Sequence, residues 1–129
     1  MRVLLDTHVA LWAVTDDARL GEQARRLISN PRHVVQVSVV TLWEIVIKHA
    51  IKPAAMPVTG GQAEGWFLAA GYQLLPVMAA QVLAVAGLPA IHQDPFDRLL
   101  VAQAQTEELL LLSADRLVLQ YPGTSDASR

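Results

Sequence analysis

The chain of 129 residues contains no cysteine and no apolar run close to the roughly 20 residues of a membrane span. Without cysteine there is no disulfide, no thiolate metal site and no cysteine nucleophile. The apolar run Val3 to Leu5 near the N-terminus ends at Asp6 and is too short for the core of a signal peptide. These absences predict a cytoplasmic protein that has no membrane segment.

The chain also lacks a large excess of charge of either sign. Ten Lys and Arg against twelve Asp and Glu give a formal net charge of −2, and the basic residues are scattered. This excludes the broad basic surface of proteins that coat nucleic acid, although a local site stays open. Aromatic residues make up only 5%, and no platform for stacking RNA bases is visible. The 53% of hydrophobic residues are ample for one packed core, so we expect a single domain over residues 1–129.

Short apolar segments alternate with segments whose apolar residues recur at helical spacing. The sequence predicts strands at Val3–Leu5, His33–Val37, Tyr72–Leu75 and Leu109–Leu112. It predicts helices at His8–Val14, Gly21–Ser29, Val40–Ile51, Gln62–Ala70 and Ala79–Ala86, and a last helix from Pro95 onward. This alternation favours an α/β fold with a parallel sheet covered on both faces. Residues 52–61 are expected as a loop, and residues from about 122 to 129 as a flexible tail.

Four acidic residues lie where such a fold brings separate segments together. They are Asp6 directly after the first strand, Glu44 in the helix after the second, Asp97 in the first turn of the last helix, and Asp115 after the last strand. All four are expected at the edge formed by the carboxyl ends of the strands. Like charges at short range need a compensating cation, and ligands that are all oxygen suit Mg²⁺ or Mn²⁺ better than zinc.

Each acid also has a structural explanation that needs no metal: Asp6 can be an ordinary turn residue after its strand, and Ser113 to Asp115 can form a cap with a first-turn acid. The segment Asp94 to Asp97 matches a helix N-terminus with Asp94 as the N-cap. Glu44 matches a capping box that begins at Thr41, and it can pair with Lys48 one turn later. Four separate capping roles would rarely place all four acids at the same edge of the sheet, whereas one shared site requires this placement. The joint placement of the acids therefore favours a function.

Four stretches of the chain carry a family resemblance. They are LLDTHVALW, SVVTLWEIVIK, LPAIHQDPFDRLLVAQA and LLLLSADR, in this order along nearly the whole chain. With them the sequence resembles the PIN-domain endoribonucleases, specifically the VapC-type toxins of bacterial toxin and antitoxin pairs. The resemblance implies a three-layer α/β/α domain with a parallel sheet of about five strands. It further implies an acidic quartet that holds Mg²⁺ or Mn²⁺, formed by Asp6, Glu44, Asp97 and Asp115. Nearby polar support comes from Thr7, Ser38 and Ser113.

The chemistry implied by the resemblance is hydrolysis of RNA. One or two metal ions held by the quartet would activate a water molecule and neutralise the charge that builds on the phosphate. His92, Arg98 and Arg116 stand close to these acids in the sequence and are candidates for contact with the substrate. Each also has a structural alternative, such as an ion pair with a carboxylate.

The resemblance implies partners as well. VapC-like toxins typically form homodimers and are silenced by a cognate antitoxin whose tail lies over the acidic cleft, so a hetero-oligomer of toxin and antitoxin is expected. The apolar residues Val46, Ile47 and Ile51 form a candidate partner patch, and they could equally belong to the core.

Other classes of protein share this size and architecture. A phosphoacceptor receiver domain would have a second acid beside Asp6, an Asp after a middle strand and a lysine late in the chain, and this sequence has none of them. A noncatalytic protein-binding module, in which the acids only cap helices, stays open. It predicts that Asp6→Ala or Asp97→Ala leaves function intact. A nuclease that threads DNA through an arch would need a longer chain.

Overall fold

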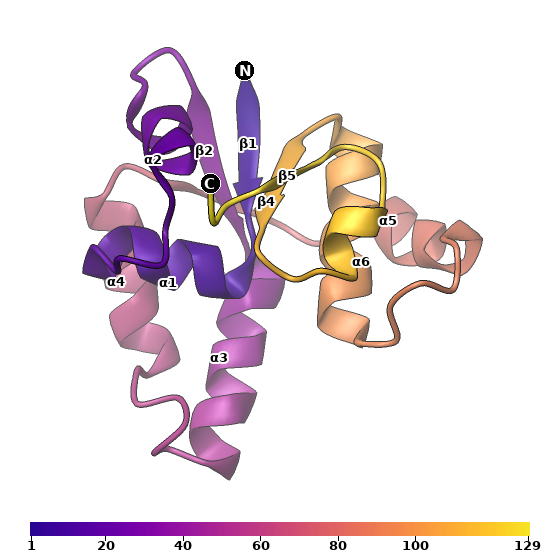
Figure 1. Ribbon diagram of the computed structural model, residues 1–129. Coiled ribbons are helices and arrows are strands. Elements are labelled where there is room, and N and C mark those ends of the chain that lie inside the picture. Colours follow the sequence, from indigo (N-terminus) through magenta and orange to yellow (C-terminus); the bar gives the residue numbers. More distant parts are fainter.

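The computed structural model describes residues 1–129 and contains one five-stranded sheet (Figure 1). The strands are β1 (Arg2–Leu5), β2 (Val34–Ser38), β3 (Gln73–Leu75), β4 (Leu110–Ser113) and β5 (Thr124–Asp126). All pairs are parallel, and the strand order is β3-β2-β1-β4-β5. The central strands β1 and β4 are nearly continuous apolar runs because helices cover both faces of the sheet.

Helices form a layer on each face of this sheet. They are α1 (Thr7–Thr15), α2 (Glu22–Ser29), α3 (Val39–Ile51), α4 (Gly60–Ala69), α5 (Ala79–Ala84) and α6 (Pro95–Glu107), with short 3-10 turns at Val85–Gly87 and Val118–Gln120. Helices α1, α2 and α4 lie on one side and α5 and α6 on the other, while α3 continues beyond the carboxyl end of β2 (Figure 1). None of the helices combines the length and the apolar character needed to cross a bilayer.

Two apolar cores separate the sheet from these layers. Side chains alternate along a strand, so Val3 and Leu5 pack with Phe67 in one core, whereas Leu4 packs with Leu100 in the other. All of these side chains are at most 1% exposed. The predicted three-layer α/β/α fold with a parallel sheet of five strands is confirmed.

The C-terminal segment differs from its prediction, because the expected flexible tail over residues 122–129 contains the fifth strand. β5 pairs in parallel with β4. Beyond it, Ala127 is fully buried and its N–H donates to Ser113 O at 2.8 Å, while its own carbonyl accepts the N–H of Gly21 at 2.8 Å. The strand escaped prediction because Thr-Ser-Asp is short and polar, which an edge strand tolerates without an apolar pattern.

Candidate metal centre

The carboxyl edge of the sheet gathers the four predicted acids around one cavity. They are Asp6 after β1, Glu44 on α3, Asp97 in the first turn of α6 and Asp115 after β4. Helix α6 leads back into β4, so its N-terminus lies at the same edge as the strand ends. The cavity has a volume of about 180 Å³ and no hydrophobic residue in its wall. Its wall is completed by Thr7, His8, Lys48, His92 and Asp94.

Asp6 and Glu44 are the most deeply buried acids of this cavity. Only 5% of Asp6 is exposed, and it caps α1 by accepting the N–H of Val9 at 2.9 Å. Burial raises its pKa above the usual range, although hydrogen bonds from the side chain of Ser113 and from Val9 oppose that rise. Ser113 Oγ also accepts the N–H of Asp115 at 3.0 Å, so the predicted supporting serine contacts two of the acids.

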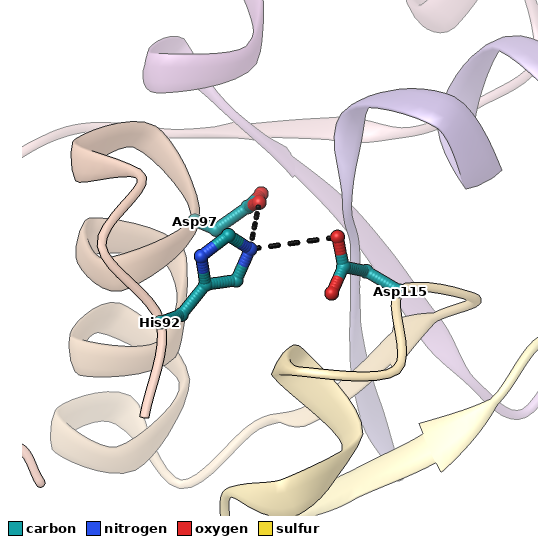
Figure 2. A group of neighbouring side chains, drawn as sticks. All are labelled: His92, Asp97 and Asp115. Carbon is teal, nitrogen blue, oxygen red and sulfur yellow. Dashed lines mark ion pairs between the residues drawn. The ribbon is translucent and has the colours of Figure 1, made fainter. Parts of the chain in front are cut away.

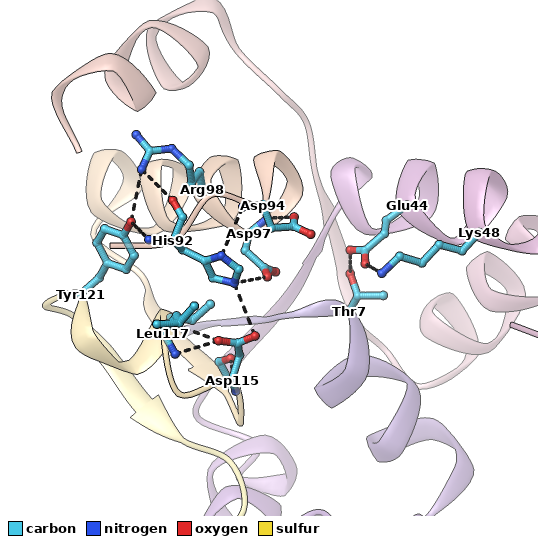
Figure 3. A network of polar contacts seen from close by, with 12 residues as sticks. Thr7, Glu44, Lys48, His92, Asp94, Asp97, Arg98, Asp115, Leu117 and Tyr121 are labelled. Atoms are coloured by element: carbon cyan, nitrogen blue, oxygen red, sulfur yellow. Dashed lines mark hydrogen bonds and ion pairs between the residues drawn. The ribbon is translucent and has the colours of Figure 1, made fainter. Parts of the chain in front are cut away.

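Glu44 is held by two polar neighbours (Figure 3). It is 4% exposed, and Thr7 Oγ1 donates to its Oε1 at 2.7 Å. Its other oxygen forms an ion pair with Lys48, one helical turn away. Partial burial opposes the charged form of Lys48, but the hydrogen bond and the charge of Glu44 raise the lysine pKa overall. Lys48 therefore places a fixed positive charge in the wall of the acidic cavity.

The start of α3 corrects two expectations. The helix begins at Val39 with Ser38 as its N-cap, so the capping box expected from Thr41 to Glu44 does not form and Glu44 lies in the second turn. Ser38 itself does not line the cavity. Its Oγ donates to the buried Gln103 Oε1 at 2.5 Å and accepts the N–H of Val40 at 3.0 Å. Ser38 therefore stabilises helix packing rather than the acidic cluster.

The carboxyl group of Asp97 is surrounded by other acids, which disfavour its ionised form. Burial, followed by repulsion from Asp94, Asp6 and Glu44, raises its pKa to about 7, against the opposing influence of His92. Asp94 caps α6 as predicted, because its Oδ1 accepts the N–H of Asp97 at 3.0 Å. An additional cation in the cavity would favour ionised Asp97.

His92 lies between two of the acids (Figure 2). Its Nε2 is 3.0 Å from Asp97 Oδ2 and 3.4 Å from Asp115 Oδ2. One donor atom from each of these three residues lies within 4.8 Å of the others, a spacing compatible with a metal ion. Burial disfavours ionised Asp115, but the N–H groups of Val118 and Leu117 hold its pKa below the usual value.

The two arginines predicted as substrate contacts do not line the cavity. Arg98 turns away from it and donates to three carbonyl oxygens, those of Pro89, His92 and Val85, each at 3.1 Å. In this structure Arg98 clamps the loop that precedes α6. Arg116 is exposed and forms no ion pair with the neighbouring acids. Tyr121 anchors the same loop through its hydroxyl group. No motif in the sequence singles this residue out.

A cluster of carboxylates at the carboxyl edge of a parallel sheet, in a cavity with no apolar wall, places this protein among α/β proteins with a candidate divalent metal centre. The model of the PIN domain family matches residues 3–122. The chain therefore belongs to the PIN domain family, a family of nucleases.

Solved structures agree with this fold. VapBC2 from Rickettsia felis, in a crystal structure with a DNA fragment from its promoter, has a TM-score of 0.69 at 14% identity, with 98% of this chain and 100% of that chain covered. A toxin-antitoxin complex from Klebsiella pneumoniae has a TM-score of 0.61 at 15% identity, with 97% of each chain covered. At such identities the likeness shows a shared fold. A comparison with curated proteins gives no match.

Proposed function

We propose that this PIN domain is a metal-dependent endoribonuclease that acts as the toxin of a toxin-antitoxin pair. One observation carries the proposal: four acids from four separate elements line a single cavity that has no apolar wall. The raised pKa values of Asp6 and Asp97 support it, because perturbed carboxyl groups in a cleft are typical of functional sites. Membership of a nuclease family and the fold of two toxin-antitoxin structures point the same way.

The donor set fits Mg²⁺, with Mn²⁺ as a substitute. Carboxylate oxygens are the preferred protein ligands of these ions, and Asp6, Glu44, Asp97 and Asp115 would hold one or two of them. When bound, the cation supplies charge neutralisation for the scissile phosphate and acidifies water for attack on phosphorus. Thr7 keeps Glu44 turned toward the cavity through its hydrogen bond. The cap on α1 fixes the side chain of Asp6, which accepts the N–H of Val9, and the cap on α6 fixes the backbone of Asp97.

A second groove gives the RNA a path toward this centre. It has a volume of about 280 Å³ and is lined by His8, Lys48, Ile51, Lys52, Ala55 and Met56. His8 and Lys48 belong to both the groove and the acidic cavity, so the two are continuous. Lysines beside an apolar floor suit a nucleotide of single-stranded RNA, whose phosphate needs a cation and whose base or sugar needs an apolar contact.

Reversing the charge of Lys52 should weaken RNA binding without impairing chemistry. Lys52→Glu is expected to raise KM for RNA about tenfold with little change in kcat, because the residue lines the groove but not the acidic cavity. Steady-state cleavage at two salt concentrations measures this effect and should show a shallower salt dependence for the variant. Arg32→Glu is the matched control, because Arg32 is exposed near the start of β2 at the opposite edge of the sheet. Equal changes in KM for both variants would contradict a specific path through the groove.

The partners proposed for this chain are a cognate antitoxin and a second copy of itself. The two structures described above are toxin-antitoxin proteins, and an acidic cavity complements a basic residue on an inhibitor. The apolar patch predicted on α3 lies at the surface, since Val46 is 53% and Ile51 78% exposed and Ile47 is half-buried. Exposed Trp43 on the same helix packs edge-on against Phe96 at 5.0 Å. We propose the part of this face around Trp43 and Val46 for homodimer formation within a toxin-antitoxin hetero-oligomer, which leaves Ile51 to the groove proposed for RNA. The cysteine-free composition suits the cytoplasm.

Cleavage of a mixed cellular RNA pool tests the proposed activity. The purified protein, free of antitoxin, is incubated with Mg²⁺ or with EDTA beside a folded Asp97→Asn variant. We expect discrete cuts that need both the metal and Asp97, and their positions would identify the target RNA. Cutting that persists in EDTA, or no cutting by a folded protein with any divalent metal, would favour the noncatalytic binding module instead.

A further inference from the structure

The imidazole of His92 lies with its Nε2 close to two of the acids, and its other ring nitrogen decides which role Nε2 can take. Its Nδ1 accepts the backbone N–H of Asp94 at 3.2 Å (Figure 3). A ring nitrogen that accepts an N–H carries no proton, so the proton of the neutral ring is on Nε2. Nε2 therefore has no lone pair to offer a cation, although it lies close to two carboxylates.

The environment of Nε2 explains what this N–H can do. The atom is buried and has no hydrogen bond in its present orientation, although Asp97 Oδ2 and Asp115 Oδ2 lie 3.0 and 3.4 Å away (Figure 2). A buried donor without a partner is costly. The terminal torsion of an aspartate is soft, so a small rotation of either carboxylate would complete the bond. His92 lines the acidic cavity, but its Nε2 is buried against the two acids, which favours a contact with the carboxylates.

Both backbone polar groups of His92 form hydrogen bonds with side chains. Its N–H donates to the hydroxyl of Tyr121 at 3.0 Å, and this hydroxyl donates to Pro89 O at 2.9 Å. Arg98 donates to His92 O at 3.1 Å and to the Tyr121 hydroxyl at 3.3 Å. Tyr121 is 2% exposed, so the anchor belongs to the core. These contacts fix the position from which the imidazole reaches the acids.

We propose that His92 is a positioning residue that keeps the carboxylates of Asp97 and Asp115 converged for a divalent cation. The two acids come from different elements, α6 and the segment after β4. The backbone N–H groups of Leu117 and Val118 donate to Oδ1 of Asp115 at 2.8 and 3.2 Å, and Oδ2 of Asp115 faces His92. Outer hydrogen bonds of this kind orient carboxylate ligands. The inference rests on the proposed metal centre but not on the proposed RNA substrate.

Titration calorimetry with Mn²⁺ alone tests this role without depending on catalysis. His92→Leu removes the donor and is expected to weaken Mn²⁺ binding by about 10- to 100-fold. His92→Gln can place a side-chain N–H near the position of Nε2 and is expected to stay within about threefold of the wild type. Equal loss of affinity in both variants would make His92 a ligand and overturn the proposal. Unchanged affinity in both would overturn it too, by reducing His92 to a loop anchor.

Removing the anchor tests the same inference from a distance. Tyr121→Phe keeps the aromatic ring but loses the hydroxyl that holds His92, and we expect Mn²⁺ binding to weaken about threefold to tenfold. Tyr72→Phe is the matched control, because Tyr72 is also buried but packs against Phe67 in the other core, and its Mn²⁺ affinity should equal that of the wild type. Equal affinities of Tyr121→Phe and the wild type would contradict the anchoring step. A wild-type protein that binds Mn²⁺ but cuts no RNA would reject the proposed activity alone.

Discussion

Asp6→Asn is expected to lower kcat/KM for RNA cleavage by about 10³-fold while the fold stays at least as stable as the wild type. Asparagine caps a helix as well as aspartate does, so its Oδ1 can still accept the N–H of Val9. The substitution removes a charge that burial already disfavours, as the raised pKa of Asp6 indicates. A catalytic metal contributes several kcal/mol to transition-state stabilisation, and about 1.4 kcal/mol corresponds to a factor of ten in rate.

Single-turnover cleavage together with urea unfolding measures both effects. Asp16→Asn is a suitable control, because Asp16 ends α1 in the left-handed conformation that asparagine also tolerates, and it loses the same charge away from the cavity. Asp6→Ala adds the loss of the cap, about 1 kcal/mol, and should be as inactive as Asp6→Asn. An Asp6→Asn protein with the wild-type cleavage rate would return Asp6 to the role of a helix cap.

Most of the candidate site was predictable because its acids adjoin the ends of strongly patterned elements. Asp6 follows an apolar strand directly, and Asp97 belongs to a helix start marked by Asp94 and Pro95. Parallel topology then brings these ends to one edge of the sheet. β5 was not predictable in this way, because its pairing depends on the free edge of β4 and not on a pattern in its own three residues.

Side-chain direction limited the remaining predictions. Arg98 is next to Asp97 in the sequence, but successive residues on a helix point about 100° apart, so the arginine reaches the loop while the acid reaches the cavity. Ser38 ends its strand beside the acidic edge, yet its hydroxyl faces α6. The contact of His92 with two acids depends on a loop anchored by Tyr121, which local sequence does not encode.

The protein in EDTA should lose stability as the pH rises from 5 to 8, and Mg²⁺ should reduce this loss. The pKa of Asp97 is about 7 in the folded protein against an ordinary 3.8, and that of Asp6 is raised as well. Between these values the folded state binds more protons than the unfolded state, so the free energy of unfolding falls as the pH increases. Two other acids have lowered pKa values, Asp17 at about 2 and Asp126. They make the free energy of unfolding increase with pH, but only at lower pH. We expect a loss on the order of 2 kcal/mol over this window.

Urea unfolding at pH 5, 6.5 and 8 distinguishes the source of this slope. In EDTA, Asp97→Asn should show a much flatter profile than the wild type, because the amide neither titrates nor repels Asp6, Asp94 and Glu44. With Mg²⁺ the wild type should gain most at pH 8, since the cation binds the ionised cluster of the folded state. A wild-type profile in EDTA that rises between pH 5 and 8, or a slope unchanged by Asp97→Asn, would mean that the acids are already compensated within the chain. The electrostatic reason for a cation at this edge of the sheet would then be lost, even if the four carboxylates still converge.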